Sequence, residues 1–221
     1  MKKITTILII ALTPILCFSQ ANDYGLWSGI SIEKKITKKF SISLNGQNRL
    51  MNNFSTTRSW LGEGGLSYKL FKGFEISGTY RYIYFNNYKP KKQIYVFEPR
   101  HRYYGDISYQ FDVKSIKISN RLRYQNQFKD NGNELVEDKS YLRHKVEIES
   151  NKKNRLKPYI SSDFFYQLGG IGLDQVRIKV GVNVKTFKGQ SIDIAPFLNL
   201  PINDLTSNKE LILQLNYKIK L

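Results

Sequence analysis

The sequence predicts an all-β fold, namely an antiparallel transmembrane β-barrel of about 10–12 strands with a polar, charged lumen. Apolar and polar residues alternate with period two along many segments, which indicates strands rather than helices. The segments reach the roughly 9–11 residues that a tilted strand needs to cross a bilayer, whereas soluble sheets favour strands of about 5–6 residues. Short basic turns alternate with longer loops between them, as in outer-membrane barrels.

Residues 1–19 are expected to be a signal peptide, and residues 20–221 the barrel. Two lysines precede an apolar run over residues 4–18, and Ser19 provides a small side chain at a cleavage point. The run is shorter than the roughly 20 residues of a spanning helix, which disfavours a retained anchor. Lipidation at Cys17 is disfavoured because a leucine precedes it, where a lipoprotein signal usually has a small side chain.

Eleven segments carry the alternating pattern. An odd number conflicts with the even strand numbers of single-chain bacterial barrels. Either one segment is wrongly split or merged, or the first stretch does not span the membrane fully. The candidate strands are 24–34, 40–51, 59–70, 74–85, 96–111, 115–128, 140–150, 157–167, 175–186, 191–200 and 210–221.

Four of these segments show the pattern most clearly. Residues 40–51 and 74–85 alternate apolar and aromatic side chains with serine, asparagine, glutamate and arginine. Residues 116–128 set isoleucine, leucine and tyrosine against lysine, serine and arginine, and residues 175–186 set valine and isoleucine against arginine and lysine. Residues 213–221 alternate to the end and resemble the C-terminal strand by which outer-membrane barrels are recognised for insertion, although that strand usually ends in an aromatic residue.

A soluble barrel that is polar outside and apolar within would share the period-two pattern. Strand length, the charged polar face and the placement of aromatic residues near strand ends favour the membrane barrel. The aromatic residues expected at the membrane interfaces are Trp60, Tyr80, Tyr82, Tyr84, Tyr103, Tyr109, Phe111, Phe164 and Tyr166.

The polar face of the strands is rich in arginine and carboxylates. Arginine keeps its charge in poorly solvated space and bonds carboxylates with a planar fork. In a narrow barrel such residues would pack the interior, and in a wider one they would line a channel that favours anions; the packed interior is preferred. The expected lumen-lining network is Arg49, Glu63, Glu75, Arg81, Glu98, Arg100, Arg102, Asp106, Arg121, Arg123, Arg143, Glu147, Asp163 and Arg177, with Lys145, Lys179 and Asp193 on the same face.

No catalytic residues, metal ligands or cofactors are predicted. Once the signal is removed the chain has no cysteine, which excludes disulfides, thiol nucleophiles and thiolate metal sites. His101 and His144 are the only imidazole bases, and by alternation both point toward lipid. Ser140 lies on the same face as His144 but more than ~12 Å along the strand. A serine on a neighbouring strand could still lie next to one of these histidines, so a lipid-acting enzyme at the barrel rim remains an alternative.

Several motifs resemble one known family. They are Tyr24-Gly-Leu-Trp27, Leu44-Asn-Gly-Gln-Asn-Arg49, Glu98-Pro-Arg-His-Arg102, Arg121-Leu-Arg-Tyr-Gln125 and Tyr141-Leu-Arg-His144. The chain resembles domain-of-unknown-function family 2490 (DUF2490), outer-membrane β-barrel proteins of Bacteroidota type, over essentially all of the mature chain. The resemblance implies a barrel in the outer membrane and implies no activity.

The mature chain would carry 33 basic and 18 acidic residues. Because an exported chain does not meet nucleic acid, the expected partners are outer-membrane lipids and glycolipid, and the barrel-insertion machinery during biogenesis. The sequence thus predicts a non-catalytic, monomeric outer-membrane barrel with either a structural role or a role in passing small solutes, including anions. The alternatives are the lipid-acting enzyme at the rim and a soluble periplasmic β-barrel binder.

Overall fold

The computed structural model describes residues 23–89, 93–152, 154–170, 172–203 and 209–221. The signal peptide expected over residues 1–19 lies outside this part of the chain. Among the described residues, no helix is long and apolar enough to cross a membrane.

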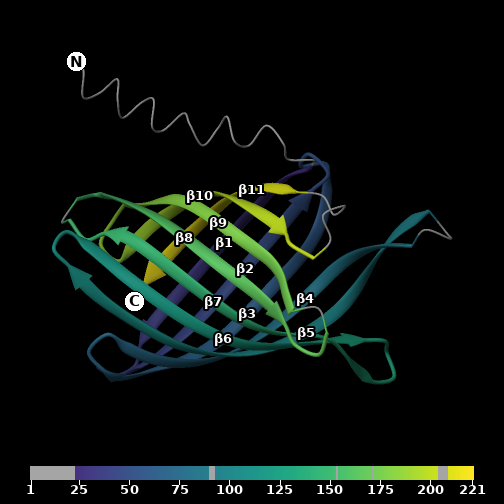
Figure 1. Ribbon diagram of the computed structural model, residues 1–221, viewed down its shortest axis with the longest axis horizontal. Coiled ribbons are helices and arrows are strands. Elements are labelled where there is room, and N and C mark those ends of the chain that lie inside the picture. Colours follow the sequence, from purple (N-terminus) through teal and green to yellow (C-terminus); the bar gives the residue numbers. More distant parts are fainter. Residues whose placement is uncertain (1–22, 90–92, 153, 171, 204–208) are drawn as a thin grey trace, which may run out of the picture.

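Eleven strands form one closed barrel (Figure 1). Most of the described chain is in these strands, and each predicted strand segment corresponds to one of them. In chain order they are β1 (Asp23–Lys35), β2 (Phe40–Met51), β3 (Thr56–Phe71), β4 (Phe74–Lys89), β5 (Ile94–Val113), β6 (Ile116–Asp130), β7 (Leu135–Ser150), β8 (Leu156–Gln167), β9 (Gly172–Lys185), β10 (Gln190–Pro201) and β11 (Glu210–Lys220).

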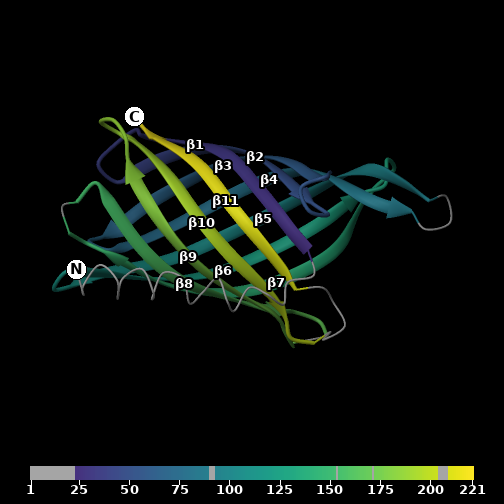
Figure 2. The same cartoon turned by 90° about the horizontal axis from the view of Figure 1, so that it is seen from above.

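The barrel closes between its first and last strands, which run in the same direction. Every other neighbouring pair is antiparallel, but β1 and β11 pair in parallel, with Asp23 opposite Glu210 and Glu33 opposite Lys220. Figure 2 shows these two strands side by side. An odd number of hairpin-connected strands requires this arrangement, because the last strand then points the same way as the first. The stretch suspected of not spanning fully is a strand of 13 residues that is paired on both sides.

Two glycines of β1 let atoms of the neighbouring strands, β2 and β11, approach it closely. A Cβ on Gly29 would lie 2.8 Å from the Gly46 carbonyl oxygen and 3.0 Å from Asn216 Oδ1, and a Cβ on Gly25 would lie 2.9 Å from the Leu50 carbonyl oxygen. The interior side of β1 therefore has no room for even a methyl group at these two positions.

Two hairpins are longer than the sequence pattern predicts. Residues 86–95 and 129–139 were expected to be loops, but β4–β5 and β6–β7 continue as paired strands through most of both segments. Figure 1 shows these hairpins projecting beyond the other strands at one end of the barrel. Cross-strand ring contacts support the longer ladder, as between Tyr88 and Tyr95, whose centroids lie 5.0 Å apart.

The two faces of the barrel wall are the reverse of those in a soluble barrel. All nine aromatic residues predicted for the membrane interfaces are exposed on the outer face, with Trp60 at 53%. Buried charged groups instead occupy the interior, including Arg81, Arg123 and Asp163. A small buried apolar cluster of Trp27, Phe197 and Ile212 also lies inside. This arrangement is that of a transmembrane β-barrel with a polar lumen.

Candidate functional site: the charged barrel interior

A cavity of about 300 Å³ lies in the middle of the barrel. Side chains from every strand except β10 contribute to its wall, so the wall encircles the interior. This central cavity is lined by Trp27, Asn45, Gln47, Arg49, Glu63, Arg81, Arg102, Tyr104, Arg121, Arg123, Arg143, Lys145, Ser161, Asp163, Phe165, Arg177, Lys179 and Gln214.

Positive charge dominates the wall of the central cavity. Nine lining side chains are arginine or lysine, and two are carboxylates. Two further carboxylates, Asp106 and Glu147, pair with lining cations. Among the described residues at this cavity, five positive charges therefore remain after every paired carboxylate has been counted.

The ion pairs that border the central cavity join side chains of the same strand or of nearby strands, so they lie against the barrel wall and do not fill the cavity. Arg123 makes two hydrogen bonds to Asp106, of 2.6 and 2.7 Å, and both residues are buried. Glu63 accepts a 2.5 Å hydrogen bond from the Tyr104 hydroxyl. The ion pairs bordering the cavity join Arg81 to Glu63, Arg123 to Asp106, Arg143 and Arg121 to Asp163, and Lys145 to Glu147.

Four lining cations have neutral amide partners instead of carboxylates. Arg49 Nε donates to Gln47 at 2.7 Å, and Arg177 Nε donates to Asn199 at 2.8 Å. The other two cations are held in the same way, Arg102 by Gln127 and Lys179 by Gln214. Within the described residues, none of these four cations forms an ion pair.

The indole ring of Trp27 lies next to two of these cations, Arg49 and Arg177. The Arg49 guanidinium carbon lies 3.7 Å from the centroid of the indole ring, and that of Arg177 lies 5.1 Å from it. Phe197 packs edge-on against the same indole at 4.9 Å. The indole is only 7% exposed, and its Nε1 donor has no hydrogen-bond partner among the described residues.

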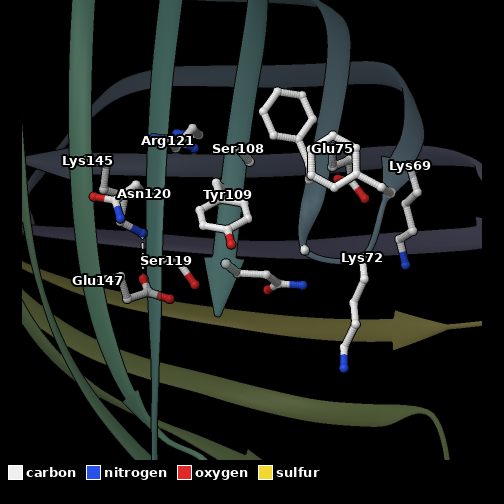
Figure 3. Close-up of a pocket in the computed structure, with 14 residues that line it drawn as sticks. Lys69, Lys72, Glu75, Ser108, Tyr109, Ser119, Asn120, Arg121, Lys145 and Glu147 are labelled. Carbon is white, nitrogen blue, oxygen red and sulfur yellow. Dashed lines mark hydrogen bonds and ion pairs between the residues drawn. The ribbon is translucent and has the colours of Figure 1, made fainter. Parts of the chain in front are cut away.

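A second cavity, of about 470 Å³, lies at the short-turn end of the barrel (Figure 3). Lys69, Lys72 and Glu75 border it from the β3–β4 hairpin. Arg121 and Lys145 line both this basal cavity and the central one, so the two adjoin. A third cavity, of about 560 Å³ and also at the short-turn end, is lined by six lysines, Lys117, Lys157, Lys185, Lys188, Lys218 and Lys220.

The predicted lumen residues fall into three levels of the interior. Glu75 and Glu147 line the basal cavity together with Arg121. Glu98 and Arg100 lie toward the long hairpins, where they pair with Lys89 and Asp138 respectively. The remaining residues surround the central cavity, with Asp106 held just behind Arg123: Arg49, Glu63, Arg81, Arg102, Arg123, Arg143, Asp163 and Arg177.

Sequence reasoning did not select the aromatic residues of the central cavity. Trp27, Tyr104 and Phe165 all line it, whereas aromatic residues were expected at the membrane interfaces. The alternation of β1 held a signal for Trp27, since it shares its face with Gly25, Gly29 and other small or polar residues.

Both histidines lie on the outer face, as alternation predicted. His101 Nδ1 is 2.7 Å from the Tyr80 hydroxyl, and its Nε2 is 3.8 Å from Asp130 Oδ2. Ser140 bonds Asn126 and Glu137 rather than His144. Within the described residues, no group of three histidine, cysteine, aspartate or glutamate side chains could hold a metal ion.

Comparison with known proteins identifies the fold and the family. The β domain of the Bordetella autotransporter BrkA matches with a TM-score of 0.51 and 8% identity, over 83% of this chain and 82% of that one. OmpT of Vibrio cholerae, expressed in the outer membrane, matches with a TM-score of 0.42 and 9% identity, over 73% of this chain and 54% of that one. No curated protein matches the sequence. Residues 24–197 match the family described as "Protein of unknown function (DUF2490)". The chain therefore belongs to the DUF2490 family, as its motifs predicted.

Proposed function

We propose that this protein is a non-catalytic barrel of the outer membrane whose interior admits and passes small anions. One observation carries the proposal, namely the surplus of five positive charges around the central cavity. A low-dielectric wall concentrates the field of such charges, which raises the local concentration of anions.

The order of the cavities supports a route from the short-turn end to the middle of the barrel. The lysine-lined cavity and the basal cavity both lie at the short-turn end, and the basal cavity adjoins the central one through Arg121 and Lys145. An anion entering from this end meets cationic side chains along its path. Glu147, which also lines the basal cavity, is already paired with Lys145 at 2.6 Å and opposes an entering anion only weakly.

The outer face supports a location in the outer membrane. Apolar and aromatic side chains cover the exterior of the strands, and an export signal is expected ahead of them. The lysine-rich short turns would then face the periplasm, where each basic residue near anionic headgroups contributes about 1 kcal/mol of attraction.

The surroundings of the histidines support the non-catalytic part of the proposal. His101 is engaged by Tyr80 among aromatic rings of the outer face, with Tyr82 at 5.4 Å between centroids. A lipid-acting enzyme would need one of the two histidines to activate a nucleophile or a water. Turnover of lipid by the purified protein, lost on His101→Ala or His144→Ala, would contradict this part of the proposal.

Single-channel recording in planar bilayers tests the passage of anions. Under a KCl gradient, the purified protein is expected to give small conductance steps whose reversal potential lies toward that of chloride. Arg102→Gln, which removes a cation that has no carboxylate partner, is expected to shift that potential toward zero, and Lys152→Gln on an exposed turn is not. Silence at all voltages, or selectivity for potassium, would overturn the proposed passage.

A further inference from the structure

We propose that the central cavity contains a binding site for a phosphate-bearing small molecule, formed by Arg49, Arg177, Lys179 and Trp27. The inference deepens the proposed function, on which it rests for the route by which the ligand reaches the cavity. It names the class of anion that the interior selects and the side chains that hold it.

The two arginines have their ligand-binding edges available. Within the described residues, Arg49 and Arg177 each give only Nε to a protein acceptor, Gln47 and Asn199 respectively. Their terminal nitrogens remain for another acceptor. A guanidinium group presents parallel N–H donors that match two oxygens of a phosphate. Lys179, which lines the same cavity and bonds neutral Gln214, adds a third positive charge.

Trp27 provides a second and independent indication of a ligand. Both guanidinium carbons lie over its indole ring, at 3.7 and 5.1 Å from the ring centroid, so the indole helps to position the two cations. Its buried Nε1 lacks a hydrogen-bond partner among the described residues. Leaving a buried donor unpaired costs about 1–3 kcal/mol, and a small rotation of the indole would bring Nε1 to a phosphate oxygen in the adjoining cavity.

The other charges of the cavity favour a ligand at this position. Glu63 and Asp163, the two lining carboxylates, are each neutralised by arginine, Glu63 by Arg81 and Asp163 by Arg143. The repulsion that an anion would meet is therefore reduced. The positive charge available to an anionic ligand is therefore that of the cations that have no carboxylate partner.

The size and the apolar part of the wall indicate a molecule larger than a halide. About 300 Å³ is available, roughly the volume of ten waters at about 30 Å³ each. Trp27 and Phe165 add aromatic surface beside the cations, against which the uncharged part of a ligand can pack. A phosphate attached to a small organic group satisfies both the cationic and the aromatic sides of the wall.

Trp27 can report on its own site. The chain has two tryptophans, and the other, Trp60, is exposed on the lipid-facing surface. In a Trp60→Phe background, all tryptophan emission comes from the cavity. The full-length mature protein, purified in detergent, is titrated with inorganic phosphate and with pyrophosphate at constant ionic strength, and chloride serves as the reference anion.

We expect a saturable change in emission with phosphate and with pyrophosphate, at concentrations at which chloride has no effect. Arg49→Gln and Arg177→Gln are each expected to weaken binding about tenfold or more, because each removes a charge-assisted pair of hydrogen bonds. Arg49→Lys, which keeps the charge but not the fork, should fall between Arg49→Gln and the parent. Arg155→Gln on an exposed turn is the matched control and should bind like the parent.

Three results would overturn the site: no saturable change with either phosphate compound, the same midpoint with chloride, or equal binding by Arg49→Gln and Arg155→Gln. Heat-modifiable gel mobility of each variant establishes that it is folded. Binding without conductance in bilayers would remove the passage and keep the site. Conductance without saturable binding would keep the passage and remove the site.

Discussion

Arginine side chains inside this barrel occur in two environments. Arg123 is buried and held on both oxygens of Asp106, whereas Arg49 and Arg177 rest on an indole face and a neutral amide. The first kind of contact fixes the wall, because each charge neutralises its partner. The second kind leaves charge directed toward the cavity. The same residue type therefore serves structure at one position and is available for a ligand at another.

The Arg123–Asp106 pair gives a prediction about stability. Arg123→Gln leaves the Asp106 carboxylate buried without its partner, and breaking a buried pair in this way costs about 3–5 kcal/mol. We expect a clear fall in the urea midpoint for unfolding from detergent micelles. Lys152→Gln, which makes the same charge change on an exposed turn, should leave the midpoint unchanged. Equal midpoints for the two variants would mean that the pair contributes little to stability.

Among the elements, β1 determines how the barrel closes. It pairs antiparallel with β2 over ten positions and parallel with β11 over eleven. Parallel pairs have slanted hydrogen bonds and are slightly less stable per residue. On the interior side of this ladder, Ile212 and Asn216 of β11 come within 3.2 Å of where a Cβ on Gly25 or Gly29 would lie, so side chains of β11 pack closely against β1 beside its hydrogen bonds.

An engineered disulfide tests the parallel register. Leu26 lies opposite Leu213, so Leu26→Cys with Leu213→Cys should cross-link under mild oxidation. The only natural cysteine is Cys17, within the expected signal. Leu26→Cys with Tyr217→Cys, displaced by four residues or about 13 Å along the strand, should not cross-link. Non-reducing gels distinguish the two outcomes, and efficient cross-linking of the displaced pair would disprove the register.

For the whole molecule, the apolar exterior makes a prediction that separates a membrane barrel from a soluble one. Leu44 lies near the middle of β2 and is 58% exposed. Leu44→Arg should destabilise the barrel in lipid vesicles by about 2–4 kcal/mol, the cost of arginine near the bilayer midplane. Phe54→Arg, in the exposed β2–β3 turn, should cost far less. A soluble barrel would tolerate both substitutions equally in buffer.

Much of this architecture could be predicted from the sequence, because period-two alternation encodes both the strand and the face to which each residue belongs. The charged residues of β6 and β9 illustrate this, since Arg121, Arg123 and Arg177 all line the central cavity. The β4–β5 and β6–β7 hairpins also continue into residues 86–95 and 129–139. The many polar residues of these two segments hid the strand pattern there, so they were predicted to be loops. Strand direction at the closure and the choice of ion-pair partners depend on contacts distant in sequence, which a single chain's pattern does not contain.

The parallel closure gives the barrel a polarity that an even-stranded barrel lacks. In an even-stranded barrel both chain ends emerge on one side of the membrane. Here Asp23 begins β1 at the end of the long hairpins, while Lys220 ends β11 beside the short turns. In the proposed outer-membrane location, peptides inserted next to Asp23 and Lys220 would therefore lie in different compartments, so that a protease added outside intact cells would remove only one of them.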